Sequence, residues 1–177
     1  EREGEYLALI DDPRKPLLNQ ALNPAAPGST FKLITASAAL QEGNVTPATT
    51  RNITSILKEF VGENGVVYPY YDWAGAVRGQ VNLYDAIAWS SNLYMFQASC
   101  GFPDEGIKGL GDDIYDSAYK LSYYARAFGL GRQTGIDIGN DAPGIIPNPE
   151  WKARVHAEDN PEDREWYHSD TCFMAVG

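Results

Sequence analysis

The stretch that decides the fold is residues 27–40, PGSTFKLITASAAL, which predicts a helix with two reactive side chains in its first turn. The helix should run from about residue 29 to residue 42, and Gly43 is placed to end it. A serine that opens a helix is usually followed three residues later by Glu or Gln, whose side chain caps the first turn. Here Lys32 occupies that position, although a cation is disfavoured at the positive end of the helix dipole. This mismatch makes Ser29 and Lys32 candidates for chemistry.

The spacing of Ser29 and Lys32 puts both side chains on one face of the predicted helix. A serine hydroxyl becomes a nucleophile when a neighbouring base takes its proton, and a lysine can be that base once its pKa is lowered. The helix dipole and partial burial both lower a lysine pKa at this position. The first N–H groups of the helix can also stabilise an oxyanion formed at the serine. The spacing alone leaves a second interpretation open, in which Ser29 caps the helix and Lys32 is a solvated surface residue.

Composition limits the class of protein. The chain has 177 residues, enough for one domain or part of one, and its 44% hydrophobic and 12% aromatic residues indicate a globular fold. The net charge of −10 argues against nucleic acid as a partner, because phosphate backbones are bound by clustered Lys and Arg. No apolar run approaches the roughly 20 residues of a membrane span. Cys100 and Cys172 are too few for a disulfide scaffold and have no zinc-binding spacing.

The remaining sequence predicts mainly helices and few strands. Residues 4–13, GEYLALIDDP, are interpreted as a strand that is apolar on both faces. Asn64 and Gly65 indicate the turn of a hairpin. Two further helical regions are expected, one behind an asparagine cap and broken by a serine-rich turn, the other later in the chain: residues 82–97 and residues 116–128.

Residues 27–40 resemble the active-site segment of penicillin-binding transpeptidases and of their serine β-lactamase relatives, with Pro-Gly before the serine and FKLITASAAL behind it. The resemblance predicts a Ser-X-Asn triplet some tens of residues downstream, and residues 86–97, AIAWSSNLYMFQ, contain one from Ser90 to Asn92. Residues 128–152, FGLGRQTGIDIGNDAPGIIPNPEWK, look like the segment that follows this triplet in class B penicillin-binding proteins, especially those of the elongation type. Three blocks in the family's order make the resemblance specific.

The resemblance implies an α+β fold of the β-lactamase/transpeptidase type, of which this chain is the helix-rich portion with few strands. Residues 1–177 are interpreted as a partial transpeptidase domain, made of its central helical part and one N-terminal strand. The membrane anchor, the N-terminal module and the C-terminal sheet strands are expected to lie outside these residues. The family's third motif is expected there too, since no KTG, KSG or RTG occurs in the sequence. Because that motif supplies the second oxyanion donor, the isolated chain is expected to be weakly active or inactive, with a rate loss of roughly 10² to 10³.

The function implied by the resemblance is that of a serine-type peptidoglycan D,D-transpeptidase, which cross-links the bacterial cell wall and binds penicillin covalently. Ser29 would attack a D-Ala-D-Ala stem peptide with Lys32 as the base. Ser90 would relay the proton to the leaving amine, and Asn92 would hold the peptide amide of the substrate. The implied partners are peptidoglycan stem peptides, β-lactam antibiotics and cell-wall elongation or division proteins, without a metal or organic cofactor. The implied location is the extracytoplasmic face of the cell membrane.

Other functions stay open at this point. A β-lactam-sensing receptor would use the acylated serine to send a signal, although such sensor domains resemble class D enzymes with Val at the third triplet position, where this chain has Asn92. A serine β-lactamase would need a base for a deacylating water, and Glu150 and Asp137 are in range by sequence order but match no motif. A degenerate or scaffolding homologue is the third alternative.

Two further clusters have both a functional and a structural interpretation. His156 and His168 lie near acidic residues and suggest a metal site, but their spacing fits no zinc or calcium pattern, so a solvated acidic loop is favoured. A group of aromatic residues could line a peptide or glycan groove, whereas packing in the core or in a lid is favoured. This group consists of Tyr68, Tyr70, Tyr71 and Trp73.

Overall fold

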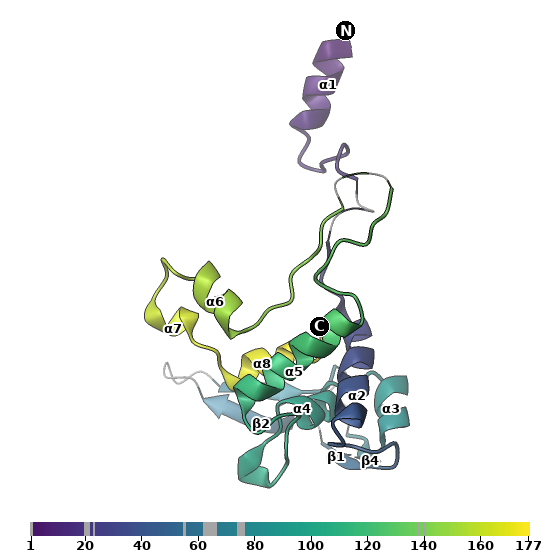
Figure 1. Cartoon of the computed structure of the whole chain (residues 1–177), viewed down its shortest axis with the longest axis vertical. Helices are drawn as coiled ribbons and strands as arrows, with labels where there is room; N and C mark the ends of the chain where they lie inside the picture. Colours follow the sequence, from purple (N-terminus) through teal and green to yellow (C-terminus); the bar gives the residue numbers. More distant parts are fainter. Residues whose placement is uncertain are drawn as a thin grey trace.

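A computed structural model describes residues 2–19, 22, 24–54, 56–61, 67–73, 77–137, 139 and 141–177. Helices dominate this part of the chain, and its strands form two small sheets (Figure 1). The helices, with η marking a 3₁₀ helix, are α1 (Arg2–Ile10), η2 (Gly28–Phe31), α2 (Lys32–Gln41), α3 (Leu83–Ala88), α4 (Asn92–Ser99), η3 (Pro103–Glu105), α5 (Ile114–Ala127), α6 (Pro149–Val155), α7 (Pro161–Arg164) and α8 (His168–Met174).

The two sheets are antiparallel pairs. β1 (Arg51–Ile53) pairs with β4 (Gly79–Val81), and β2 (Ile56–Val61) pairs with β3 (Val67–Tyr71). The pairing of β2 with β3 is the arrangement that a hairpin requires, while the predicted turn at Asn64 and Gly65 lies outside the described residues. The helix-rich α+β fold with few strands is confirmed.

The N-terminal segment is a helix, so the strand predicted over residues 4–13 is wrong. Helix α1 stands away from the other helices in Figure 1, and several of its apolar side chains are exposed. A strand needs a neighbour for its N–H and C=O groups, and none of the described strands pairs with this segment. A helix satisfies most of those groups internally. In the described part of the chain, no helix combines the length and the apolar character that crossing a bilayer requires.

The helical predictions are confirmed, with small differences at the ends. The helix expected over residues 29–42 begins as the single 3₁₀ turn η2 and continues as α2, and Gly43 behind it has a left-handed φ of 69°. The region expected over residues 82–97 is divided into α3 and α4 at the serine-rich turn. The helix expected over residues 116–128 is α5.

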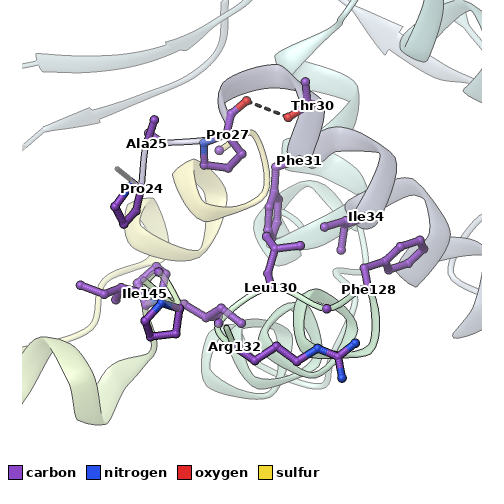
Figure 2. Close-up of a pocket in the computed structure, with 18 of the residues that line it drawn as sticks. Pro24, Ala25, Pro27, Thr30, Phe31, Ile34, Phe128, Leu130, Arg132 and Ile145 are labelled. Carbon is purple, nitrogen blue, oxygen red and sulfur yellow. Dashed lines mark hydrogen bonds between the residues drawn. The ribbon is translucent and has the colours of Figure 1, made fainter. Parts of the chain in front are cut away.

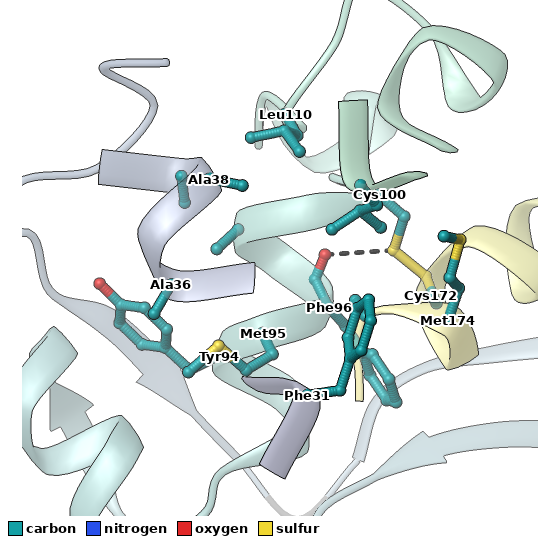
Figure 3. Packing of buried hydrophobic residues seen from close by; sticks show 14 of the residues in the cluster. Phe31, Ala36, Ala38, Tyr94, Met95, Phe96, Cys100, Leu110, Cys172 and Met174 are labelled. Carbon is teal, nitrogen blue, oxygen red and sulfur yellow. Dashed lines mark hydrogen bonds between the residues drawn. A yellow bond between two sulfur atoms is a disulfide. The ribbon is translucent and has the colours of Figure 1, made fainter. Parts of the chain in front are cut away.

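Helix α4 lies at the centre of the hydrophobic core. Every residue of α4 after Asn92 is buried, which is the pattern of a helix enclosed on all sides. Helix α2 packs against it through small side chains, among them the fully buried Ala38 and Ala39, which allow a close approach. Figure 3 shows this contact together with the aromatic rings of Phe31 and Phe96. The first residue of α4 is therefore held against the first turn of α2 by the core.

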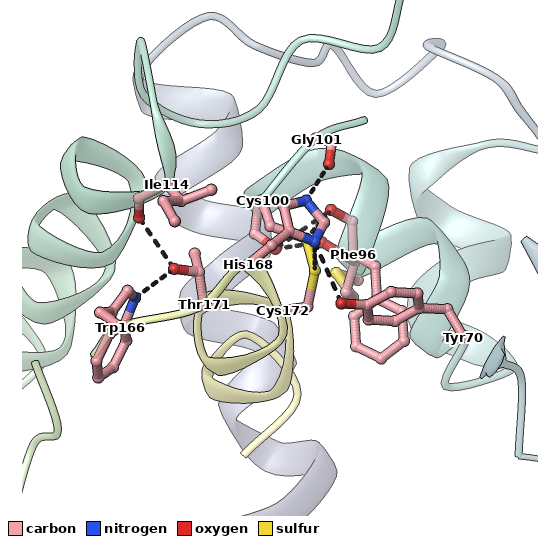
Figure 4. The surroundings of a disulfide bond; sticks show 11 residues. Tyr70, Phe96, Cys100, Gly101, Ile114, Trp166, His168, Thr171 and Cys172 are labelled. Carbon is pink, nitrogen blue, oxygen red and sulfur yellow. Dashed lines mark hydrogen bonds between the residues drawn. A yellow bond between two sulfur atoms is a disulfide. The ribbon is translucent and has the colours of Figure 1, made fainter. Parts of the chain in front are cut away.

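A disulfide joins the end of α4 to α8. Cys100 and Cys172 are bonded to each other, with their Cα atoms 5.3 Å apart, although they are 72 positions apart in the sequence (Figure 4). Both cysteines are buried. This pairing cannot be predicted from the sequence, since the spacing of the cysteines does not reveal which distant segments meet. The bond ties the central helix to the C-terminal helix of the chain.

Candidate active site

Ser29 lies in η2, on an exposed turn that precedes the buried part of α2. Gly28 before it has a φ of 55°, a left-handed conformation that suits glycine. In a 3₁₀ turn, side chains three residues apart are eclipsed, so the turn carries Ser29 and Lys32 on one side. Among the described residues, no hydrogen bond engages the Ser29 side chain, so Ser29 is not the side-chain cap of this helix. Ser29 is exposed to solvent.

The turn is also held from the far end of the chain. Gly177 lies against the backbone of Gly28, and a side-chain carbon added at Gly177 would collide with the Gly28 carbonyl group. Thr35 in α2 donates a hydrogen bond of 2.7 Å from its Oγ1 to the carbonyl oxygen of Ala175. These contacts fix the position of the Ser29 turn relative to α8.

Lys32 is buried, with 3% of its surface exposed, so it is not a solvated surface residue. Its Nζ donates to the Ser90 carbonyl oxygen at 2.6 Å and to the Ser90 Oγ at 2.9 Å. Burial lowers the pKa of Lys32, because the charged ammonium loses its hydration, and the nearby Asp72 carboxylate opposes this with a smaller upward effect on the pKa. A lysine with a lowered pKa can take up a proton at a pH where a free lysine would already hold one.

Ser90 occupies the turn between α3 and α4 in a strained conformation. Its φ of 54° is left-handed, which is uncommon for a residue with a Cβ and is often associated with functional sites. The conformation directs both the carbonyl oxygen and the hydroxyl of Ser90 to Lys32. The structure thus brings together Lys32 and Ser90, which are 58 residues apart in the sequence.

Asn92 is the first residue of α4 and is half-buried beside this turn. No partner for its side-chain amide occurs in the part of the chain that the structure describes. Ser91, between Ser90 and Asn92, is the N-cap of α4, and its Oγ accepts a hydrogen bond of 3.2 Å from the backbone N–H of Tyr94. The middle residue of the triplet is thus structural. Of the outer two, Ser90 contacts Lys32 through its hydroxyl, whereas the Asn92 amide has no partner among the described residues.

Asp72, which the sequence analysis did not single out, contacts the triplet directly. Its carboxylate is fully buried and accepts hydrogen bonds from the Ser91 hydroxyl at 2.7 Å and from the Asn92 N–H at 2.8 Å. It also accepts one from the N–H of Trp73 at 3.0 Å. The only sequence signal is an acid behind an aromatic strand, and nothing in that signal points to a segment 20 residues away.

The aromatic group is divided between the core and the surface. Tyr70 is buried and its ring contacts Phe96 and Phe102, as expected for packing, and burial raises its pKa to about 12. Tyr71 and Trp73 are exposed, and the Trp73 indole donates to the carbonyl oxygen of Trp89, the residue before Ser90. The side chain of Tyr68 lies outside the described residues.

The two histidines are in different places. His156 pairs with Asp159 at 2.7 Å on the surface. His168 has its Nε2 2.7 Å from the Gly101 carbonyl oxygen, so this nitrogen carries the proton and Nδ1 accepts from the Tyr70 hydroxyl at 3.2 Å (Figure 4). His168, Cys100 and Cys172 bring metal-type ligand atoms within 4.8 Å of one another. Since the two sulfur atoms are bonded to each other, the group offers no thiolate to a metal ion.

A pocket of about 810 Å³ lies beside the Ser29 turn without including Ser29 or Lys32 (Figure 2). Its lining is mainly apolar and comes from η2 and α2 on one side and from the segment after α5 on the other. Phe31, Ile34, Leu130, Arg132 and Ile145 are among the lining residues. The pocket is a groove next to the candidate site, and the polar groups that meet at Lys32 lie outside it.

Comparison with known proteins identifies the family. A model of the penicillin-binding protein transpeptidase domain matches residues 1–161. The chain belongs to this family. The membership agrees with the arrangement just described, in which a buried lysine behind a serine turn binds the first residue of a Ser-X-Asn triplet.

The relatives of this transpeptidase-family chain are of the elongation type, as predicted. Peptidoglycan D,D-transpeptidase MrdA of Escherichia coli (strain K12) is 29% identical over 174 residues, which cover 98% of this chain and 24% of the relative. The chain spans about a quarter of the length of the curated relatives it matches.

Solved structures of penicillin-binding proteins share the fold. Penicillin-binding protein PBP2 from Helicobacter pylori matches with a TM-score of 0.76 and 28% identity, over 99% of this chain and 29% of that one. The complex between PBP2 and MreC from the same organism matches with a TM-score of 0.74 and 29% identity, over 99% and 28% of the two chains. The transpeptidase-like α+β fold predicted from the sequence is confirmed by these neighbours.

Proposed function

We propose that this chain provides the acyl-serine site of a peptidoglycan D,D-transpeptidase, which cross-links stem peptides and is acylated by penicillin. The observation that carries the proposal is the burial of Lys32 with its Nζ between the carbonyl oxygen and the hydroxyl of Ser90. A neutral amine has two N–H donors and one lone pair. Both donors are used by Ser90, so the lone pair remains to accept the proton of Ser29, which the eclipsed 3₁₀ turn places on the same side.

The proposed reaction assigns one role to each residue. The Ser29 Oγ attacks the carbonyl carbon of the penultimate D-alanine while Lys32 takes the hydroxyl proton, and an ester bond forms. Ser90 relays this proton: its hydroxyl proton passes to the nitrogen of the terminal D-alanine as the C–N bond breaks, and the Lys32 ammonium replaces it, so that Lys32 is neutral again. Asn92 holds the substrate amide through its side-chain amide. An amine of a second stem peptide then attacks the ester, which restores the Ser29 hydroxyl and forms the cross-link.

The proposed location is the extracytoplasmic face of a bacterial membrane. The Cys100–Cys172 disulfide supports it, because such bonds persist in oxidising compartments and are rare where thiol reductants are abundant. We also propose cell-wall elongation proteins as partners. The support is that the related H. pylori PBP2 forms a complex with MreC.

The test measures the intact mass of the full-length protein that the gene encodes, after incubation with penicillin. One penicilloyl adduct is expected on the wild type and none on Ser29→Ala. Ser37→Ala, in the same helical segment, is the matched control and should keep the adduct, because the Ser37 hydroxyl only donates to the Leu33 carbonyl oxygen. An adduct on Ser29→Ala, or none on a folded wild type, would refute the proposal. Product analysis with stem peptides then separates transpeptidation from hydrolysis or signalling.

A further inference from the structure

The buried Asp72 has no role in the reaction proposed above, although it lies at the centre of the polar contacts. It follows β3 directly and has none of its surface exposed. Burying a carboxylate is costly unless hydrogen bonds or charges compensate for lost hydration. Asp72 has such compensation from two backbone N–H groups, those of Trp73 and Asn92, and from the Ser91 hydroxyl. The N-terminus of α4, which Asn92 begins, adds a favourable dipole.

The contacts of Asp72 hold Ser91 and Asn92, the two residues that follow Ser90 in the triplet. The Ser91 hydroxyl donates its single proton to Asp72 and accepts from the Tyr94 N–H, so the carboxylate and the first turn of α4 are joined through one side chain. The Asn92 backbone is bound to the other carboxylate oxygen. Ser90 precedes these residues in a left-handed conformation that local preference does not favour. The fixed neighbours on its C-terminal side keep Ser90 in that conformation.

We propose that Asp72 is a positioning residue of this site, whose buried carboxylate holds Ser91 and Asn92 so that Ser90 meets Lys32, and whose negative charge acts on the Lys32 ammonium. The inference rests on the proposed acyl-serine function. It goes beyond that function because Asp72, which follows β3 and is bound to the start of α4, acts on Lys32, the base on α2.

The electrostatic part follows from the surroundings of Lys32. The Asp72 charge raises the pKa of Lys32 against the larger lowering by burial. Three other ionisable groups on the packed elements bind elsewhere: Tyr94 of α4 donates to the Thr49 carbonyl oxygen, and Lys120 and Tyr124 of α5 bind Glu42 behind the far end of α2. Asp85 of α3 lies in the first turn of that helix. Removing the Asp72 charge therefore removes the upward effect that opposes the lowering of the Lys32 pKa by burial.

The experiment is the pH dependence of penicillin acylation in the gene-encoded protein and three variants. Asp72→Asn should move the acid limb of the rate profile to lower pH, because Lys32 loses its proton more easily without the Asp72 charge. Ser91→Ala removes the hydroxyl that joins Asp72 to the first turn of α4 but changes no charge. The acid limb should therefore stay in place, while the plateau rate falls about ten-fold. Asp85→Asn is the control for loss of one negative charge and should change neither quantity.

The outcomes separate this inference from the proposed function. If the wild type is not acylated, the acyl-serine function itself fails. If the wild type is acylated and a folded Asp72→Asn variant keeps the wild-type acid limb, the electrostatic role of Asp72 is overturned. Should Asp72→Asn not fold, the Ser91→Ala variant still decides the positioning role, because an unchanged plateau rate in folded Ser91→Ala contradicts it. Circular dichroism of each variant establishes folding.

Discussion

The exposed turn of Ser29 and the half-buried turn of Ser90 form the two sides of the site and are built in opposite ways. Ser29 makes no side-chain hydrogen bond among the described residues and faces solvent. Ser90 is bound by Lys32, and its neighbours are bound by Asp72. Preorganised polar groups lower a reaction barrier because they need not rearrange when charge develops. The comparison indicates that the base side is fixed in advance, while the nucleophile side stays accessible to substrate.

The largest effect should come from removing the base. Lys32→Met keeps the length of the side chain and suits a buried position, but it has no group that can accept the Ser29 proton. We expect the acylation rate to fall roughly 10³-fold. In the wild type, acylation should decrease as the pH falls through the pKa of Lys32, which burial holds below the usual lysine value, because the protonated amine is not a base. Stopped-flow acylation by a chromogenic β-lactam measures both effects.

Lys120→Met is the control for this prediction. Lys120 forms ion pairs with Glu42 and Asp116 on the surface, away from Ser90. Its replacement should leave the acylation rate within a factor of two or three. A Lys32→Met variant that folds and retains the wild-type rate would show that the contacts between Lys32 and Ser90 have no catalytic consequence.

The next effect separates the hydroxyl of Ser90 from its backbone conformation. Ser90→Gly and Ser90→Ala both delete the hydroxyl, and both should lower acylation by roughly 10²-fold if it relays the proton. Glycine accepts the left-handed φ of 54° without the cost of a Cβ, so Ser90→Gly should be more stable than Ser90→Ala by about 1 kcal/mol. Urea unfolding measures the difference in stability. Equal wild-type activity in both variants would contradict the relay role.

Removing the disulfide should have a smaller effect on activity but a large effect on stability. Cys100→Ala combined with Cys172→Ala removes a cross-link between residues 72 positions apart, which in the loop-entropy model is worth about 4 kcal/mol. The urea midpoint should fall accordingly, while acylation of the remaining folded protein changes only a few-fold, since neither cysteine contacts Lys32 or Ser90. An unchanged midpoint would show that the core alone holds α4 against α8.

The smallest effect is expected at Glu150, the residue considered for a deacylating base. Glu150 accepts a hydrogen bond from the Tyr119 hydroxyl, which lowers the pKa of Glu150. Both side chains are exposed and lie on α6 and α5. Glu150→Gln should not change the rate at which the penicilloyl adduct is lost, measured by mass spectrometry. A clear slowing of that loss, absent from Tyr119→Phe, would favour the β-lactamase alternative.

Local signals in the sequence were reliable where one segment carried all the information. Asn82 caps α3 by accepting from the Asp85 N–H, as the cap pattern predicts, and Gly43 follows α2 in a left-handed conformation. The family resemblance of residues 27–40 and of the triplet identified Lys32 and Ser90, which the structure brings into contact. These features depend on neighbours a few positions away or on a motif read directly from the sequence.

Predictions failed or were missing where the answer lay in a distant segment. The apolar alternation of residues 4–13 fits a strand, but strand formation depends on a partner, and α1 forms instead. The pairing of Cys100 with Cys172 and the contact of Asp72 with the triplet likewise join segments that no local pattern connects.

The sequence by itself determined the helices over residues 29–42, 82–97 and 116–128, the family and the identity of Ser29, Lys32, Ser90 and Asn92 as candidate residues. The tertiary structure decided that Lys32 is buried, that Ser90 reaches it in a strained conformation and that Asp72 supports the turn. The reason is physical. A residue type defines which protons a side chain can give or take, whereas its pKa and its hydrogen-bond partners depend on the burial and the charges that folding brings around it.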